Sequence, residues 1–194
     1  MRLVLASRNE HKLRELSVLL SPHEVVALPQ GLQLPPEDGA TFAANALDKA
    51  RAASSATGLT AVADDSGIEA AALGGAPGIR SARFAGDGAS DEENLAKLLR
   101  EVPPDGDTRV AYVCALALVR SDGAATLVEG RCTGRLSHEL RGECGFGYDP
   151  AFVPDDGPGA GLTMAELSVA QKDAISHRGR AARSLLALLD KEAG

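Results

Sequence analysis

Two adjacent carboxylates, Asp64 and Asp65, follow a short apolar run at residues 59–63 and precede a serine and a glycine. We predict that this run is a strand ending at the aspartates, because the polar and glycine residues interrupt the apolar pattern. The two carboxylates then lie at the carboxyl end of a strand, which is the usual place for a site in an open α/β sheet. Neighbouring strand residues point to opposite faces, so at most one of the two easily shares a cleft with Glu37. Such carboxylates suit Mg²⁺, which prefers oxygen ligands and keeps several waters. A tight turn explains the same residues, and that alternative stays open.

A second polar group, at residues 7–12, separates an apolar run at 3–6 from leucines that recur at helical spacing. It places a hydroxyl, an amide and an ammonium at a helix start, where backbone N–H groups and the helix dipole favour a phosphate. A simple helix cap explains the serine and the asparagine as well. Asn45 and Lys49, four residues apart, share one face of a predicted helix, either as site groups or as a solvated surface.

A third group lies in the glycine-flanked segment 145–150, which holds two of the six aromatic residues, Phe146 and Tyr148, beside Asp149. An aromatic on such a loop resembles a slot for a planar base, although an ordinary loop anchor is the alternative. Further along, residues 176–179 (Ser-His-Arg-Gly) follow Lys172 by one helical turn. These side chains supply donors for a base edge or a phosphate, or form a solvated helix end.

The elements that must position these groups alternate between short apolar runs and helical patterns, which predicts an α/β protein with a mixed sheet. Strands are expected at 3–6, 25–28, 59–63, 110–119 and 126–133, with a hairpin turn at 121–123. Helices are expected after Asn9, over 41–57, after Ser90, after Ser168 and around the leucines of 185–189. The glycine-rich segment 155–161 is expected to be a loop.

Composition narrows the functional classes. The chain has 194 residues, 44% hydrophobic and 24% charged, which predicts a single domain over residues 1–194. A net charge of −7 disfavours a nucleic-acid partner. Neither the P-loop pattern nor the dinucleotide-binding G-x-G-x-x-G pattern occurs. The three cysteines lack the spacing of a disulfide framework or a zinc site, so we expect a cytoplasmic protein with reduced thiols. No apolar run reaches the length of a membrane helix, so we expect no membrane partner.

Six segments, in order and at compatible spacings, resemble the non-canonical purine nucleoside triphosphate pyrophosphatases, the inosine/xanthosine triphosphate pyrophosphatase family. The segments are 7–12, 41–49 with its Thr-Phe, Asn and Lys, 63–67, 74–83, 146–150 and 176–179. The resemblance covers nearly the whole chain. It implies an elongated α/β fold with a central mixed β-sheet flanked by helices, two lobes with a substrate cleft between them, and a homodimer. Ala44 departs from the family pattern, which commonly has Glu there.

The resemblance also implies an activity and residue roles. The substrates would be ITP, dITP and XTP, hydrolysed to the monophosphate and pyrophosphate, which cleanses the nucleotide pool and keeps deaminated purines out of DNA and RNA. Asp65 would be the catalytic base toward the attacking water, and Glu37 and Asp65 would hold Mg²⁺. The implied substrate-binding residues are Ser7, Arg8, Asn9, Glu10, His11, Lys12, Lys49, Ser66, Phe146, Gly147, Tyr148, Asp149, Lys172, His177 and Arg178. Phe146 would stack on the purine.

Two alternatives remain. A related nucleotide pyrophosphatase of the septum-inhibitor type would act on other modified nucleotides and should differ at Phe146 and at residues 176–178. A non-catalytic nucleotide-binding module would bind triphosphate without turnover, and the two carboxylates, Glu37 and Asp65, argue against it. Hydrolysis between the α- and β-phosphates needs charge neutralisation, an oriented water and a base, but no covalent nucleophile. We therefore interpret Ser66 as a binding group.

Overall fold

The computed structural model describes residues 1–158 and 161–193, and its core is a six-stranded mixed sheet with the strand order β2-β1-β3-β4-β5-β6. Strand β1 is parallel to β2 and to β3, whereas β5 and β6 are antiparallel. The strands are β1 (Arg2–Leu5), β2 (Glu24–Val26), β3 (Ala61–Ala70), β4 (Arg109–Val119), β5 (Ala125–Leu136) and β6 (Phe152–Pro154). The predicted α/β fold with a mixed sheet is confirmed.

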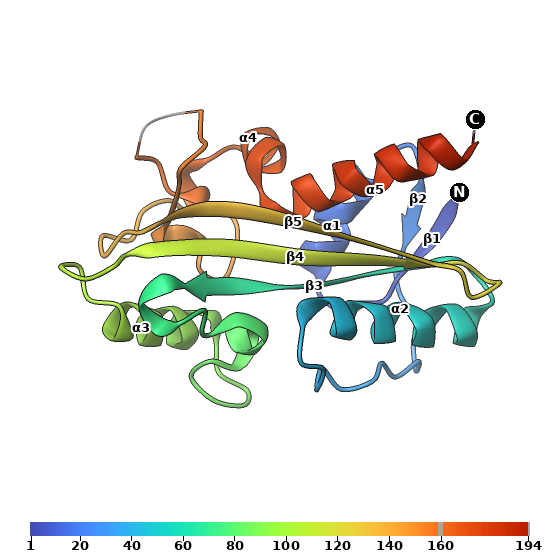
Figure 1. Ribbon diagram of the computed structural model, residues 1–194, viewed down its shortest axis with the longest axis horizontal. Coiled ribbons are helices and arrows are strands. Elements are labelled where there is room, and N and C mark those ends of the chain that lie inside the picture. The colour runs from blue at the N-terminus through green and yellow to red at the C-terminus, as the bar shows by residue number, and fades with distance from the viewer. Residues whose placement is uncertain (159–160, 194) are drawn as a thin grey trace. The chain divides into compact units, whose positions relative to one another are not determined.

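Five α-helices accompany the sheet in the described part of the chain (Figure 1). They are α1 (Glu10–Leu19), α2 (Phe42–Thr57), α3 (Asp91–Glu101), α4 (Val169–Ile175) and α5 (His177–Ala193). Local capping explains their ends. The Thr41 side chain accepts from the Ala44 N–H at the start of α2, and Gly58 ends that helix in the left-handed conformation with φ 68°. Reciprocal capping boxes begin α3 and α4 at Ser90 and Ser168, as predicted.

The chain divides into two compact units. The first unit comprises Met1–Asp65, Cys114–Gly130 and Arg178–Gly194, and the second comprises Ser66–Val113 and Arg131–His177. In the first unit, leucines of β1 and α1 pack with Leu185 and Leu189 of α5. Helix α2 lies on the opposite face of β1, where Ala46, Ala50 and Ala53 are fully buried (Figure 1). Small alanines allow this helix to approach the sheet closely.

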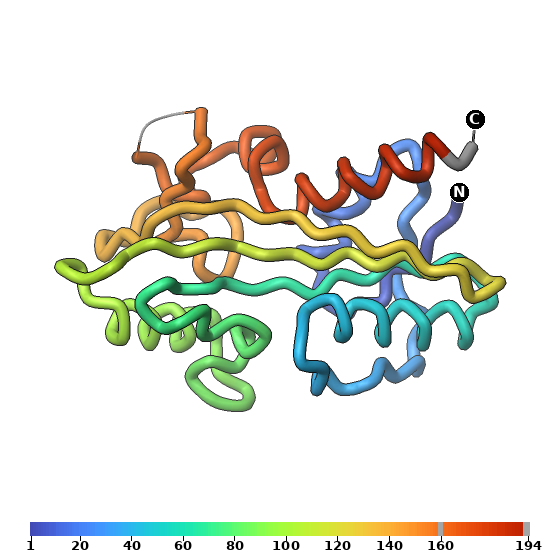
Figure 2. The backbone as a smooth tube through the Cα atoms, in the orientation of Figure 1, coloured from blue at the N-terminus to red at the C-terminus, as the bar shows by residue number. Residues whose placement is uncertain are grey.

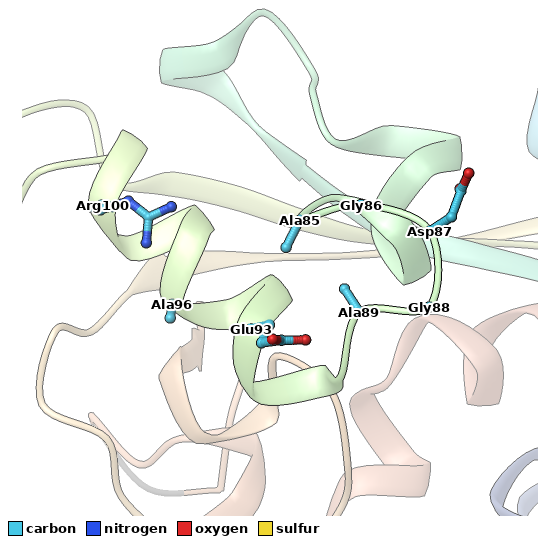
Figure 3. A pocket seen from close by; sticks show the side chains of 8 residues that line it. All are labelled: Ala85, Gly86, Asp87, Gly88, Ala89, Glu93, Ala96 and Arg100. Atoms are coloured by element: carbon cyan, nitrogen blue, oxygen red, sulfur yellow. The ribbon is translucent and has the colours of Figure 1, made fainter.

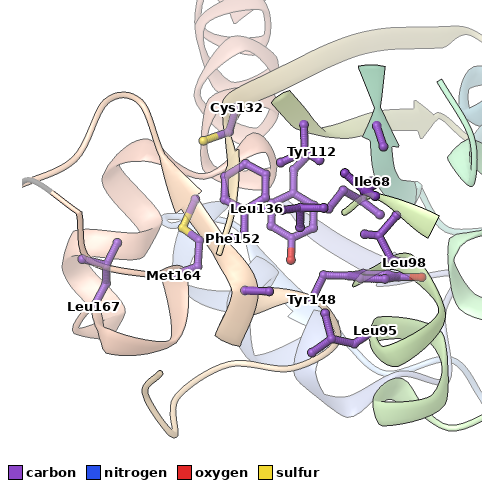
Figure 4. Packing of buried hydrophobic residues seen from close by; sticks show 14 residues of the cluster. Ile68, Leu95, Leu98, Tyr112, Cys132, Leu136, Tyr148, Phe152, Met164 and Leu167 are labelled. Carbon is purple, nitrogen blue, oxygen red and sulfur yellow. The ribbon is translucent and has the colours of Figure 1, made fainter. Parts of the chain in front are cut away.

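The second unit has its own apolar core around Tyr112, Phe152 and Met164, against which Leu95 and Leu98 of α3 pack (Figure 4). Strand β4 is buried from Val110 to Val119, as its nearly continuous apolar run predicts. The tube in Figure 2 follows β4 into β5 through the predicted turn, where Arg120 and Ala124 close the hairpin with a backbone hydrogen bond. Strand β5 is longer than predicted, β2 is shorter, and β6 has no counterpart in the sequence-based prediction.

One strand prediction is wrong. Strand β3 does not end at Asp64 and Asp65 but continues to Ala70, so the carboxylates lie inside a ten-residue strand. The strand continues because both carboxylates find partners within the protein, and Ile68 and Ala70 then extend its buried apolar pattern. The tight-turn alternative is thereby excluded.

The predicted loop 155–161 is irregular at 155–158 and at 161, whereas residues 159–160 lie outside the described residues. None of the helices in the described ranges combines the length and the apolar character that a membrane crossing requires.

Candidate active site

The two carboxylates of β3 have separate sets of partners, as opposite faces of a strand require. Asp64 is fully buried in the first unit. Its Oδ1 lies 3.0 Å from Nζ of Lys12 on α1, and its Oδ2 accepts a 3.0 Å hydrogen bond from Nε of Arg178 on α5. Arg178 also pairs with Glu15 of α1. Burial would raise the pKa of Asp64, but the two cations more than offset it and hold the pKa below its usual range.

Asp65 faces α2. Its Oδ2 accepts a 2.9 Å hydrogen bond from Nδ2 of Asn45, and its Oδ1 lies 3.4 Å from Nζ of Lys49. The Lys49 ammonium also contacts the Glu37 carboxylate and donates to the main-chain carbonyl of Asp64 over 2.8 Å. Asn45 and Lys49 are buried, which excludes the solvated-face alternative. Their spacing of one helical turn aims both side chains at the same carboxylate.

These contacts shift the pKa of both partners. Burial raises the pKa of Asp65, Lys49 lowers it and the negative charge of Glu37 raises it, with a net increase. Burial lowers the pKa of Lys49, but the carboxylates of Asp65, Asp64 and Glu37 raise it by more. The net effect is a raised pKa, so the ammonium stays charged. A carboxylate with a raised pKa is better suited to accept a proton than an ordinary aspartate.

The donor set fits Mg²⁺. Glu37 and Asp65 present carboxylate oxygens to one shared cation, the Lys49 ammonium, which shows that both side chains reach a common point. Mg²⁺ is commonly held by one or two carboxylates together with substrate phosphates and waters. Within the described residues, no group of three or more acidic, histidine or cysteine side chains is arranged to hold a metal ion, so a cage built entirely from protein ligands is not indicated there.

The segment before α1 is organised by caps. Oδ1 of Asn9 accepts from the N–H groups of His11 and Lys12, and Oγ of Ser7 accepts from the Asn9 N–H. Nη2 of Arg8 donates to the carbonyls of Pro29 and Leu32. Glu10 is exposed, and His11 contacts Arg14. The helix-cap alternative is therefore confirmed for Asn9, whereas the Ser7 hydroxyl binds the N–H of the capping residue. Lys12 alone of the six predicted phosphate residues has a described contact with a β3 carboxylate.

Most of the predicted base-binding residues lie in the second unit and meet at Asp149, which is buried. Its Oδ2 accepts from Nζ of Lys172 over 2.9 Å and from the N–H of Phe146 over 3.0 Å. The Lys172 ammonium lies 5.1 Å from the centroid of the Phe146 ring. Gly147 donates its N–H to Asp91, and the Tyr148 hydroxyl donates to the Ser81 carbonyl. The loop is thus anchored and also carries a cation beside an aromatic face.

His177 begins α5 and is buried, with its ring stacked on Tyr112 at a centroid distance of 4.7 Å. Ser176, Lys172 and Arg178 are buried as well, which excludes a solvated helix end at this position. Ser66 is half-buried in β3. In the first unit, the structure therefore brings Lys12 and Arg178 together at Asp64. It brings Asn45 and Lys49 together at Asp65, and Lys49 also contacts Glu37. It gathers Phe146, Asp149, Lys172 and His177 in the second unit.

Sequence reasoning missed three residues of these networks as site residues. The spacing of Asn45 from Lys49 places both on one helix face but predicts no specific role for the amide. Glu15 lies three residues after Lys12, a spacing that places both on one face of α1. Tyr112 carries the clearest available signal, a single hydroxyl in a strand otherwise built from apolar residues and one cysteine after Arg109.

Two cavities border helix α3 of the second unit. One, of about 430 Å³, is lined by α3 residues and by the segment 142–147, including Phe146 and Gly147. The other, of about 530 Å³, is lined by residues 85–89 with Glu93, Ala96 and Arg100 (Figure 3). None of the predicted site residues lines this second cavity.

Comparisons with known proteins show what the chain is similar to. Residues 3–188 match the model of the Ham1 family. A dITP/XTP pyrophosphatase of Frankia alni is 52% identical over 201 residues, covering 97% of each chain. One from Mycolicibacterium paratuberculosis is 48% identical, covering 97% of this chain and 95% of the relative. The solved structure of the Staphylococcus aureus Ham1 protein has a TM-score of 0.86 at 38% identity, covering 99% of this chain and all of that one.

Proposed function

The chain belongs to the Ham1 family, and from that membership and the geometry of its carboxylates we propose that it hydrolyses ITP, dITP and XTP to the monophosphate and pyrophosphate. The removal of deaminated purine nucleotides from the precursor pool, before they enter DNA or RNA, is the proposed role. The observation that carries the proposal is the convergence of Glu37 and Asp65 on one buried cation, the Lys49 ammonium. The names of the relatives support the substrate class.

The first unit supplies the proposed hydrolytic groups. Asp65 accepts the proton of the attacking water, and its raised pKa supports this role. Asn45 orients the Asp65 carboxylate through its 2.9 Å hydrogen bond. Lys12 and the backbone N–H groups at the start of α1 bind the triphosphate, together with Ser7, Arg8, Asn9, Glu10 and His11. Glu37 and Asp65 hold Mg²⁺, which when bound neutralises phosphate charge and helps align the phosphorus for attack.

Asp64 is given a different role from Asp65. Its carboxylate is buried between Lys12 and Arg178, and its lowered pKa makes it a poor proton acceptor. We assign Asp64 to the orientation of these two cations. Arg178, which pairs with Asp64 and Glu15, remains in the proposed substrate-binding set with Lys49 and Ser66.

The second unit supplies the proposed base-recognition groups. Phe146 stacks on the purine, and Lys172 and His177 donate to keto oxygens at the base edge. Gly147, Tyr148 and Asp149 shape this loop. Adenine presents an amino donor where hypoxanthine and xanthine present a keto acceptor, so donors facing adenine would stay unpaired. The proposed site therefore selects against ATP.

The proposal also includes a single catalytic domain over 1–194, a homodimer, a cytoplasmic location, and no nucleic-acid or membrane partner. The net charge of −7 supports the absence of a nucleic-acid partner, because a negatively charged surface repels a phosphate backbone.

Product analysis tests the proposal. ITP, dITP, XTP, GTP and ATP are each incubated with the protein and Mg²⁺ in ¹⁸O-labelled water, and the products are separated. We expect pyrophosphate and labelled monophosphate from the first three substrates, with ATP hydrolysed very poorly. Accumulation of nucleoside diphosphate, or label in inorganic phosphate, would assign the protein to another reaction class. Binding of ITP without turnover would support the non-catalytic alternative.

A further inference from the structure

Tyr112 is the hydroxyl-bearing residue of β4, and its side chain is buried within the core of the second unit (Figure 4). One face of its ring stacks on Phe152, with centroids 4.3 Å apart and an interplanar angle of 18°. The ring also stacks on His177, with centroids 4.7 Å apart and an angle of 19°. A phenylalanine would fill this position equally well by shape. The hydroxyl therefore needs its own explanation, since a buried phenol is costly without a partner.

The hydroxyl donates a 3.0 Å hydrogen bond to Oδ1 of Asp149. The other oxygen, Oδ2, accepts from Lys172 and from the Phe146 N–H. Donors on both oxygens restrain rotation of the carboxylate about its Cβ–Cγ bond. Without the Tyr112 hydroxyl, that rotation would displace the oxygen that holds the Lys172 ammonium. Burial and the Asp149 charge raise the pKa of Tyr112, so the hydroxyl remains a proton donor at neutral pH.

Tyr112 therefore connects two residues from different elements. Its hydroxyl fixes Lys172 of α4 through Asp149, and its ring supports the imidazole of His177 at the start of α5. We propose that Tyr112 is the positioning residue that sets the geometry of the Lys172 and His177 donors and thereby determines the preference for a 6-keto purine. This inference rests on the function proposed above and adds the residue that organises its base-recognition groups. Tyr112 is not a catalytic residue, because its contacts reach the substrate only through other side chains.

The physical argument is one of donor placement. Discrimination between a keto oxygen and an amino group depends on donors held in a fixed direction, because a mobile ammonium can move away from a mismatched base. Lys172 has a long flexible side chain, so its direction comes from what binds its head. In this structure the Asp149 carboxylate binds the Lys172 ammonium, and Tyr112 restrains that carboxylate.

The test compares Tyr112→Phe, Tyr112→Leu and Thr163→Val with the wild-type protein. Tyr112→Phe removes the hydroxyl and keeps the ring, whereas Tyr112→Leu removes both. Thr163→Val is the matched control, because Thr163 is fully buried in the same unit and its hydroxyl donates to the Arg141 carbonyl over 2.8 Å. For each protein, kcat and KM are measured for dITP and dATP with Mg²⁺, and the thermal midpoint is recorded.

We expect Tyr112→Phe to lower the dITP to dATP ratio of kcat/KM about tenfold, mainly through KM for dITP, since a hydrogen bond to a charged group is lost. Tyr112→Leu should lower the ratio further. Thr163→Val should be destabilised comparably to Tyr112→Phe but keep the wild-type ratio. A folded Tyr112→Phe protein with the wild-type ratio would overturn the inference. An equal loss of selectivity in Thr163→Val would overturn it as well.

Calorimetric binding of dIMP and dAMP separates this inference from the proposed function. If the wild-type protein hydrolyses none of the triphosphates, the proposed function fails. The dIMP to dAMP affinity ratio of the wild-type protein and Tyr112→Phe then still decides the role of Tyr112. A preference for dIMP that falls about tenfold on removal of the hydroxyl supports the inference, whereas an unchanged ratio, or no preference in the wild type, refutes it.

Discussion

The side-chain amide of Asn45 donates a 2.9 Å hydrogen bond to Oδ2 of Asp65, and its direction is set from the other side. Oδ1 of Asn45 accepts from the N–H of Gly39 over 2.8 Å, so the amide must present its NH₂ group to the carboxylate. A Cβ at Gly39 would lie 2.5 Å from this oxygen, which explains why a glycine occupies that position. Gly39 and Asn45 together thus orient Asp65, the proposed catalytic base.

Replacing Asp65 by Asn should lower kcat by about 10²–10⁴ while the fold is retained. The substitution removes a proton acceptor and a metal charge, but its amide oxygen can still accept from Asn45. Turnover of dITP at saturating Mg²⁺ measures the loss of kcat, and the far-UV circular dichroism spectrum shows whether the fold is retained. Near-normal turnover would exclude Asp65 as the base.

Asp64→Asn should instead act mainly on stability, lowering the free energy of unfolding by about 3–5 kcal/mol at pH 7, because the buried cations of Lys12 and Arg178 lose their shared anion. The folded-state pKa of Asp64 is depressed, so its stabilisation is fully present above the unfolded-state pKa near 4 and is lost as the pH falls below it. Urea unfolding of the wild-type protein and of Asp64→Asn at pH 7 and pH 3 gives the free energy of unfolding of each. The difference between the two free energies should be smaller at pH 3 than at pH 7. An equal difference at both pH values would contradict the depressed pKa of Asp64.

Lys172→Met keeps the length of the side chain and removes its charge. We expect kcat/KM for ITP to fall at least tenfold and the value for ATP to change little, because only the keto base has an acceptor for this donor. Parallel kinetics with ITP, XTP, GTP and ATP give the comparison. Equal losses for ITP and ATP would exclude Lys172 from selection of the base.

Gly145→Ala should be more harmful than Gly147→Ala. Both glycines have a positive φ, 85° and 64°, so each alanine carries a backbone penalty of about 1–2 kcal/mol. A Cβ at Gly145 would also lie 2.1 Å from Oδ2 of Asp149, the oxygen that holds Lys172, whereas a Cβ at Gly147 would meet nothing within 4 Å. Thermal unfolding of both variants tests the order, and equal midpoints would show that the loop relaxes around the added methyl group.

Thiol labelling should distinguish the three cysteines. Cys144 is exposed, whereas Cys114 and Cys132 are buried. Burial, together with the Asp64 charge, raises the pKa of Cys114 to about 12, so this thiol stays protonated and unreactive at pH 8. We expect one rapidly labelled thiol in the folded protein and three in urea, with Cys144→Ser removing the rapid one. Rapid labelling of that variant would show that the core opens on the labelling timescale.

Local elements could be predicted because their causes lie within a few residues. The caps at Thr41, Ser90 and Ser168 and the glycine after α2 involve groups at most four residues apart. The apolar run of β4 likewise predicts a buried strand from its own composition. The resemblance to the pyrophosphatase family also rested on sequence alone, and the Ham1 family match confirms it.

The tertiary structure decided which of the candidate site residues contact one another. Asp64 and Arg178 are separated by 114 positions in the sequence, and their ion pair exists only because β3 and α5 pack in one unit. The length of β3 was mispredicted for the same reason, since a buried carboxylate is tolerated in a strand only where distant cations or amides contact it. Tyr112 and Asp149 likewise show no local relationship. Short-range preferences act through the backbone and can be read along the chain, whereas buried charges and hydroxyls depend on partners that only folding brings within hydrogen-bond distance.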